Sequence, residues 1–327
     1  MLFDRRQIAP TLRHLAAAYG IHIGTVSWRF PGWCGLLYDE ERYLWRTHFS
    51  KKRFSARCLE EYGQVFPTVE VDSTYYALPK MAFVEGIASQ VPEDFVFSFK
   101  VPDDITMKTF PPLKAFGDRA GQANPYFLSA GLFQMGFLRR LEPLSGRVGC
   151  LIFEFSHFHP GDFEHGRDFV AALDAFFAEL PTGWRYAVEI RNRGWLHPDY
   201  FGMLRRHGVT HVYNHWTRMP SIAEQMVLWP PEEAPFIVGR WLLTPGRSLE
   251  WAREQFEPFH QIREIDPEAR ESMRRLIRCR QTGRCAGPLY LYVGNEWEGN
   301  ALHSIADVIE SLSGRDGPAA AAGGGVG

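Results

Sequence analysis

The chain has few of the features that mark secreted, membrane-spanning or duplex-binding proteins. Its 327 residues include 5 cysteines and no Cys-x-x-Cys pair, so we expect reduced, mostly structural thiols. No apolar run approaches the roughly 20 residues that cross a bilayer, and the opening MLFDRRQIAP lacks the apolar centre of a signal peptide. Neither charge sign dominates, because 36 Lys plus Arg against 38 Asp plus Glu leave a net charge of −2. We therefore expect a cytoplasmic protein whose partners include neither a membrane nor duplex nucleic acid.

Glycine motifs that bind phosphate are missing as well. Neither GxGxxG nor GxxxxGKS occurs, which weakens the case for a doubly wound, nucleotide-binding sheet. The composition is that of a folded chain, with 45% apolar and 14% aromatic residues, so disorder is excluded for the bulk. A length of 327 residues suits two average domains or a single large α/β barrel, and the order of the predicted elements must decide.

Short β-branched and aromatic runs, bounded by turn residues, recur eight times along the chain. They cover residues 21–27, 68–73, 95–101, 148–155, 185–191, 208–214, 236–242 and 288–295. Segments of helical period lie between them, over residues 55–65, 80–90, 126–141, 165–180, 198–207, 268–279 and 302–312. Alternating strands and helices, with connections too long for hairpins, predict a parallel sheet with right-handed crossovers. Because eight such strands close a (β/α)8 barrel, we predict a TIM barrel.

Segments outside this pattern occur at both ends and after two strands. Residues 1–20 contain an amphipathic helix over 4–19 that we expect to cap the lower end of the barrel. Residues 21–313 are predicted to form one barrel domain, and the tail over 314–327 is predicted to be disordered. Long excursions over 29–53 and 101–124 follow strand ends on the side where barrel enzymes place their working loops.

Charged residues occupy strand positions that should point into the barrel. Side chains alternate across a strand, so in FVFSFKV the three Phe face the helices and Lys100 points inward. The inward charges found by this counting are Glu70, Asp72, Glu154, Glu189, Lys100, Arg191 and Arg240, and Asn295 closes the last strand. An unpaired buried charge costs several kcal/mol, so these groups must pair with one another or with a bound polar ligand.

Depth along the strands divides this set into two groups. Glu70 and Glu189 lie about one layer below the strand ends, and we interpret them as a structural network. The groups at the ends, on the catalytic face of such barrels, are Asp72, Lys100, Arg191, Arg240 and Asn295. A charged cluster at a concave strand-end site is typical of a functional site, and we favour that interpretation for these residues.

Five segments carry a specific sequence pattern in a fixed order. GTVSW, FPTVEVDSTYYALP, PEDFVFSFKVPDDIT, YAVEIRNRGWL and LYLYVGNEWEGNA lie between about residues 21 and 312. In these segments the chain resembles the domain of unknown function 72 family, the YecE-like proteins. The resemblance implies a TIM barrel and supplies no reaction. The family pattern falls on Trp28, Glu70, Asp72, Ser73, Thr74, Tyr75, Pro79, Lys100, Thr106, Glu189, Arg191, Trp195, Asn295 and Gly299.

The chain departs from the family pattern at two places. Met107 stands where the family usually has His, which removes a titratable group. Near the end, where the family usually has paired Asn residues, Gly294 precedes Asn295. An activity that relied on that His or on both amides would not be expected here.

Histidines and aromatic residues near the strand ends are further candidates. His157 and His159, with Glu154, resemble part of a metal site, although nearby arginines would repel a cation. His211 and His215 could act as general acid or base near neutral pH, or be structural hydrogen-bonded groups. Aromatic side chains suited to stacking on a sugar or base are Trp28, Trp33, Tyr75, Tyr76, Trp195 and Trp216. No His or Cys cluster accompanies Cys279 and Cys285, so we expect no zinc there.

These observations lead to one functional hypothesis with two alternatives. The hypothesis is an enzyme, a hydrolase or lyase without metal or cofactor, that applies acid/base chemistry to a small anionic or sugar-like substrate. Its catalytic candidates are Asp72, Lys100 and Glu154, and its substrate-binding candidates are Trp28, Thr74, Tyr75, Arg191, Trp195, Asn214, Arg240 and Asn295. The first alternative is a metal-dependent phosphoesterase on nucleic acid, with Glu154, Glu189 and His157 as ligands. The second is a non-catalytic binding barrel.

The hypothesis assigns a role to each group of candidates. Arg191, Arg240 and Lys100 would hold the anionic part of the substrate. Asp72 or Glu154 would move the proton, and Asn295 would orient the substrate. Lys100 could alternatively form a Schiff base, but the surrounding carboxylates disfavour the lowered pKa that this reaction requires.

Overall fold

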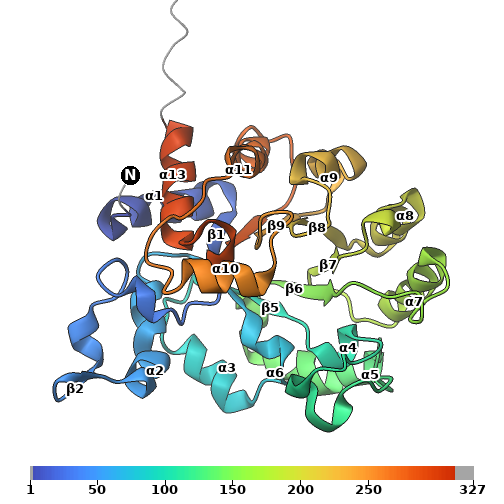
Figure 1. Ribbon diagram of the computed structural model, residues 1–327. Coiled ribbons are helices and arrows are strands. Elements are labelled where there is room, and N and C mark those ends of the chain that lie inside the picture. Colours follow the sequence, from blue (N-terminus) through green and yellow to red (C-terminus); the bar gives the residue numbers. More distant parts are fainter. Residues whose placement is uncertain (1–2, 314–327) are drawn as a thin grey trace, which may run out of the picture.

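The computed structural model describes residues 3–313 and is built around a closed barrel of eight parallel strands (Figure 1). The strands are β1 (Ile21–Val26), β4 (Thr68–Val71), β5 (Val96–Lys100), β6 (Val148–Phe155), β7 (Tyr186–Ile190), β8 (Thr210–His215), β9 (Ile237–Trp241) and β10 (Leu289–Val293). Each pairs with its neighbours in chain order, and β1 closes the ring on β10 with Ile21 opposite Leu289. The predicted TIM barrel and its strands are confirmed, and no strand end differs by more than two residues.

Helices surround the strands on the outside (Figure 1). The longer ones are α1 (Arg5–Tyr19), α2 (Lys51–Tyr62), α3 (Met81–Ala88), α7 (Gly166–Ala178), α8 (Pro198–His207), α11 (Pro267–Gln281) and α13 (Ala301–Ser313). Residues 126–141, predicted as one helix, form α5 (Ala130–Leu132), a π-helical turn (Phe133–Leu138) and α6 (Arg139–Leu141). Shorter elements that the periodicity did not indicate are the hairpin β2 (Leu44–Trp45) and β3 (His48–Phe49), α4 (Asp103–Thr106), α9 (Ile222–Leu228), α10 (Leu249–Phe256) and α12 (Asn295–Glu298).

Helix α8 illustrates why some boundaries could be predicted to the residue. Its N-cap is His197, whose ring accepts a hydrogen bond from the Asp199 backbone, and Pro198 occupies the first helical position. The helix has basic residues in its last turn and stops at Gly208, which has a φ of 63°. This left-handed conformation suits glycine and terminates the helix.

Alternation along the strands separates two apolar layers. Phe97 and Phe99 on β5 belong to the core between the strands and the surrounding helices. A second, separate cluster fills the lower part of the barrel with Cys150, Ile152, Ala187, Val212, Phe236, Val238, Tyr290 and Tyr292. The Tyr292 hydroxyl spans the lumen, since it lies 3.0 Å from Thr68 Oγ1 and 2.6 Å from Ser98 Oγ. The inward parity used to locate Lys100 and Glu154 is therefore confirmed.

The N-terminal helix α1 leads directly into β1. Asp4 caps its first turn, and Gly20, with a φ of 63°, ends it. Phe3, which precedes the helix, contacts Phe66 and His303. The tail predicted over 314–327 lies outside the described residues. Within residues 3–313, no helix combines the length and the apolarity needed to span a bilayer.

The cysteines differ from the expectation at one pair. Cys279 and Cys285 form a disulfide between the end of α11 and the loop that leads to β10. The prediction of reduced thiols is wrong for these two residues, because the turn at Gly283 brings their Cα atoms to 5.5 Å. The expectation of free thiols is confirmed for Cys34, Cys58 and Cys150.

Candidate functional site

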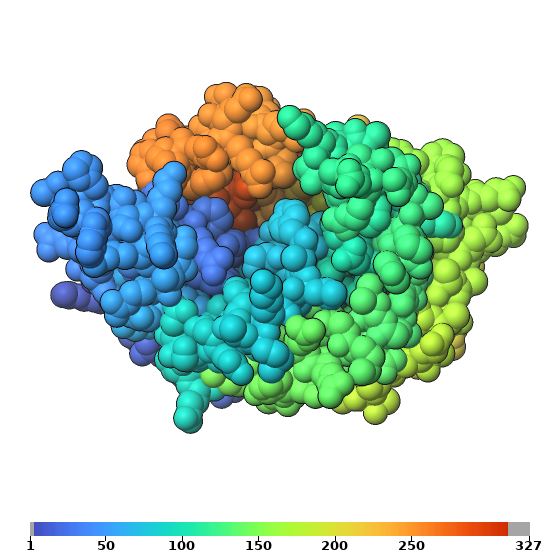
Figure 2. All heavy atoms as spheres, turned by 90° about the horizontal axis from the view of Figure 1, so that it is seen from below, coloured from blue at the N-terminus to red at the C-terminus, as the bar shows by residue number. Residues whose placement is uncertain are grey.

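A cavity of about 400 Å³ lies at the C-terminal ends of the barrel strands. Its lining includes Asp72, Lys100, Arg191, Trp216 and Glu296, and we refer to this cavity as the mouth. Figure 2 shows a hollow in the surface, bordered by the orange segment that contains α10 and by blue and green segments. The mouth therefore lies on the side where the sequence predicts a functional site.

Arg240 on β9 lies at the centre of a buried ion-pair network below the mouth. Its Nε and Nη2 donate to the two oxygens of Glu70 at 2.8 and 2.6 Å. Its Nη1 donates to Glu154 at 2.8 Å and also to Glu189. The residue is 1% exposed, and each of its guanidinium nitrogens is engaged by a carboxylate. Arg240 therefore belongs to the network with Glu70 and Glu189 and also lines the bottom of the mouth.

Arg191 and Lys100 connect this network to the mouth. Arg191 follows β7 and directs Nε to Glu189 at 3.0 Å and Nη2 to Glu154 at 2.9 Å. Its guanidinium lies 3.8 Å from the centre of the Trp216 ring. Both contacts fix the plane of the guanidinium, and Arg191 keeps 13% of its side chain exposed. Arg191 is thus fixed by two carboxylates and an indole ring and keeps limited contact with solvent.

The Lys100 ammonium lies between two carboxylates and an aromatic face. Its Nζ is 2.8 Å from Glu154 Oε2 and 3.4 Å from Asp72 Oδ1. The ring centre of Tyr75 lies 3.7 Å from the same Nζ atom. Burial would lower the pKa of Lys100, but Glu154 and Asp72 raise it above its usual value. Lys100 therefore remains an ammonium ion, which argues against a Schiff-base role.

Glu154 receives three cations on a single oxygen. Lys100, Arg191 and Arg240 all lie within 2.9 Å of its Oε2 atom. Burial would raise the pKa of Glu154, but these cations, Arg191 foremost, hold it well below the usual carboxyl value. Glu154 therefore stays ionised at working pH and is poorly suited to carry a proton.

Asp72 differs from the other three carboxylates in its exposure. It begins the 3-10 turn Asp72–Tyr75 immediately after β4, and 27% of its side chain is exposed. The corresponding fractions are 3% for Glu154 and 0% for Glu70 and Glu189. Burial raises the pKa of Glu70 to about 7 in spite of Arg240, but Glu70 has no access to the mouth. Both Asp72 and Glu154 line the mouth, and Asp72 is the more exposed of the two.

Three predicted binding residues make backbone contacts that shape the site. The Thr74 hydroxyl lies 2.7 Å from the Lys100 carbonyl oxygen and holds the turn against β5. The Asn214 amide donates to the Ile190 carbonyl at 3.1 Å, and its oxygen has no partner in the described part of the chain. The Asn295 amide oxygen accepts from the Ala301 backbone, because β10 ends at Val293 and the chain turns into α12. We interpret these as supporting contacts.

Tyr75 and Trp28 are both buried at the strand ends. Tyr75 lines the mouth, and burial raises the pKa of its hydroxyl to about 12. That hydroxyl is close to Ser156 but forms no hydrogen bond of normal geometry with any described residue. Trp28 is 2% exposed and lies under the Arg29 guanidinium at 4.8 Å, outside the lining of the mouth.

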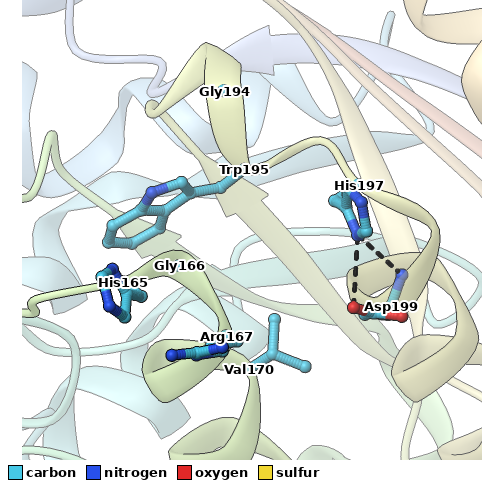
Figure 3. Close-up of a pocket in the computed structure, with 8 residues that line it drawn as sticks. All are labelled: His165, Gly166, Arg167, Val170, Gly194, Trp195, His197 and Asp199. Carbon is cyan, nitrogen blue, oxygen red and sulfur yellow. Dashed lines mark hydrogen bonds and ion pairs between the residues drawn. The ribbon is translucent and has the colours of Figure 1, made fainter.

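Trp195 lies in a separate depression of about 370 Å³ (Figure 3). Its indole stacks on Phe158 and Phe169, each at 5.3 Å, and lies close above Gly166. His197 and Asp199 lie across this depression and are joined to each other at the start of α8. The structure therefore does not bring Trp195 to the mouth with the other candidates.

Several mouth residues were not predicted as site residues. Arg253 on α10 and Glu296 on α12 form an ion pair of 3.2 Å at the rim. Both lie on short helices without a strand pattern, so parity counting could not find them. Met107 also lines the mouth, at the position where the resembling family usually has His. A thioether therefore occupies that part of the wall.

The histidines predicted as metal ligands or as acid/base groups do not form a metal site in the described residues. In residues 3–313, no group of three metal-binding side chains is arranged to hold an ion. His157 Nδ1 faces the Arg191 carbonyl oxygen at 3.2 Å. His211 contacts Tyr200 and Gln225, and burial lowers its pKa to about 4. His215 pairs with Asp266 at 2.9 Å, so neither strand histidine faces the mouth.

Comparisons with known proteins agree with this architecture. Residues 22–322 match the family model described as "Protein of unknown function DUF72". The UPF0759 protein YecE of Escherichia coli K12 is 29% identical over 181 residues, which cover 55% of this chain and 50% of that protein. The O157:H7 strain gives the same values. The chain thus spans about half the length of the curated relatives it matches.

Solved structures extend the likeness over nearly the whole chain. A DUF72 family protein from Enterococcus faecalis V583 has a TM-score of 0.60 at 19% identity, covering 90% of this chain and 97% of that one. A DUF72 family protein from Thermotoga maritima MSB8 has a TM-score of 0.59 at 22% identity, covering 90% and 99%. At these identities the likeness concerns the fold.

Proposed function

Because the chain belongs to the DUF72 family, whose description gives no reaction, we propose its function from the mouth alone. The proposal is an enzyme that binds a small anionic or sugar-like molecule at the mouth and transfers a proton through Asp72, without a metal ion. The observation that carries it is the contrast between Asp72, 27% exposed, and Glu154, 3% exposed and bound by three cations. Of the two proton carriers that the sequence suggests, only Asp72 has both access and a single cationic neighbour within the network.

Lys100 supports Asp72 in this role. Its ammonium lies 3.4 Å from Asp72 Oδ1 and is held in place by Glu154 and the Tyr75 ring. Asp72 would accept a proton from a substrate carbon next to a carbonyl group. The fixed ammonium would then stabilise the negative charge that develops on the substrate, without reorganising during the reaction. Arg191, which contacts the same Glu154 oxygen as Lys100, would hold an anionic substituent.

Deuterium exchange tests this proposal without knowledge of the product. The protein is incubated in D2O with a panel of phosphorylated and carboxylated sugars, and incorporation is followed by proton NMR. Asp72→Asn should slow the exchange about 10²- to 10⁴-fold, the range for loss of a general base. Glu310→Gln, an exposed change on α13, is the matched control and should leave the exchange unchanged. Equal rates for Asp72→Asn and the wild-type chain would overturn the proposal.

A metal-dependent phosphoesterase is the main competing function. Its ligands would be Glu154, Glu189 and His157, but both carboxylates accept hydrogen bonds from guanidinium groups. Elemental analysis of protein purified without added metal separates the two proposals. Stoichiometric zinc or manganese would contradict the metal-free scheme. Ligand binding without any turnover would instead favour the non-catalytic barrel.

A further inference from the structure

A second cavity, of about 650 Å³, lies directly beside the mouth. It shares Arg191 and Trp216 with the mouth and is lined further by His157, Arg218 and Arg247. None of its lining residues is a carboxylate. We refer to this cavity as the basic chamber. The cavity thus offers three guanidinium groups; Arg191 and Arg247 are paired with carboxylates outside its lining, and Arg218 has no ion pair with any residue of the described range 3–313.

Arg218 occupies a costly backbone position at the edge of the basic chamber. It lies in the turn after β8, where the Met219 backbone donates to the Trp216 carbonyl at 3.1 Å, and its φ is 66°. A side chain other than glycine or asparagine in this left-handed region costs about 1 kcal/mol or more. Arg218 is exposed and makes no ion pair with any residue in the described range 3–313. Neither a fold contact nor backbone preference accounts for an arginine here.

The guanidinium groups of the other two arginines lie over indole rings. Arg191 lies 3.8 Å from the Trp216 ring and Arg247 lies 4.2 Å from the Trp251 ring. Arg191 directs Nε and Nη2 into the barrel, which leaves Nη1 without a carboxylate partner in the described chain. Arg247 directs Nη2 to Glu264 at 2.8 Å. Donors fixed in this way lose little freedom on binding an anion.

We infer that the basic chamber binds the phosphoryl group of a small phosphomonoester. Planar guanidinium groups match phosphate oxygens in bidentate geometry, and a phosphoryl group has enough oxygens to accept from the unpaired Arg218 and from the free nitrogens of Arg191 and Arg247 together. The remainder of the ester would extend past Arg191 and Trp216 into the mouth, toward Asp72. This last step rests on the proposed function, whereas the phosphoryl site does not.

Calorimetric titration with inorganic phosphate, at constant ionic strength, tests the phosphoryl site. Saturable binding of one phosphate is expected, and Arg218→Gln and Arg247→Gln should each weaken it about tenfold, as for loss of one charged hydrogen-bonding group. Arg206→Gln on α8 is the matched control, since Arg206 is 58% exposed and paired with Asp174, and it should leave the affinity unchanged. Thermal unfolding checks that each variant is folded. Absent binding, or equal affinity in all variants, overturns the inference.

Two further measurements separate this inference from the proposed function. Asp72→Asn should retain phosphate affinity, because Asp72 does not line the basic chamber. Retained affinity together with unchanged deuterium exchange in Asp72→Asn would contradict the proposed function and leave the phosphoryl site standing. Competition then identifies the ligand class. Glycerol phosphate should displace bound phosphate at a lower concentration than a short single-stranded oligonucleotide without terminal phosphates. The opposite order would indicate a nucleic-acid backbone and overturn the inference.

Discussion

Lys100 and Glu154 form an ion pair of 2.8 Å across the neighbouring strands β5 and β6. The pair links two environments, because Glu154 also contacts the buried Arg240 while Lys100 also contacts the partly exposed Asp72. Glu154 thus belongs to the buried network around Arg240, and Lys100 connects this network to the mouth. Substitutions in the two environments should therefore have different effects.

Replacement of Arg240 by methionine should strongly destabilise the fold. Arg240→Met leaves Glu70, Glu154 and Glu189 buried without their shared cation. Removing one partner of a buried ion pair costs about 3–5 kcal/mol. Urea unfolding measures the free energy of unfolding, with Arg206→Met expected within about 0.5 kcal/mol of the wild-type chain, as for exposed sites. A loss below 1 kcal/mol for Arg240→Met would show that the network contributes little.

Glu154 should make the protein sensitive to acid. Neighbouring cations hold the pKa of Glu154 below its ordinary value of 4.5, so the unfolded chain binds this proton more readily than the folded one. The stabilisation is present above pH 4.5 and is lost as the pH falls further. In Glu154→Gln, the free energy of unfolding should therefore decline less steeply below pH 4.5 than in the wild-type chain. Denaturant unfolding at a series of pH values measures both slopes, and equal slopes would contradict the assignment.

His211 should contribute a pH dependence in a higher range. Burial lowers its pKa from 6.5 to about 4, so between these values the unfolded chain takes up a proton that the folded chain does not. The contribution of His211 to stability should fall by on the order of 3 kcal/mol as the pH drops from about 6.5 to 4, against an opposite slope from Glu70, whose pKa burial raises to about 7. His211→Gln should flatten this part of the profile. His22, whose pKa is also lowered to about 4, leaves a residual slope in the variant. An unaltered profile would mean that His211 titrates normally.

The Cys279–Cys285 disulfide should stabilise the chain without affecting the mouth. It closes a short loop with a sequence separation of 6 residues, for which chain entropy gives about 2 kcal/mol. Dithiothreitol should lower the free energy of unfolding by about that amount in the wild-type chain only. A double variant, Cys279→Ser with Cys285→Ser, should match the reduced protein and not respond to the reagent. Phosphate affinity should be the same in both redox forms.

Much of the barrel follows from signals that act over a few residues. Alternation of side chains is strict in a strand, so counting from Phe97 and Phe99 placed Lys100 inside. The cap residues of α8 likewise set its ends. These signals fail where the backbone changes course or a side chain is long. Parity ceased to apply to Asn295 because β10 ends two residues earlier.

Arg240 shows the second kind of failure. Its position near a strand end suggested a group facing the mouth, which it does line, but parity did not indicate that Glu70, Glu154 and Glu189 would all engage its guanidinium. Sequence position determines where a Cα atom lies, not where a flexible side chain finds its partners. The Cys279–Cys285 pair and the rim residues Arg253 and Glu296 were missed for a related reason, since their contacts depend on loop geometry.

The hydrogen bonds of Arg240 constrain how this sequence could change over time. The Arg240 guanidinium on β9 donates to carboxylates on three other strands. Replacing Arg240 or any one of these carboxylates therefore leaves at least one buried polar group without a hydrogen-bond partner. An apolar interior of similar volume could be as stable, but it is reached only when donor and acceptors are exchanged together. Stepwise replacement would therefore pass through less stable intermediate sequences. This disfavours gradual loss of the Arg240 network, whatever reaction takes place in the mouth.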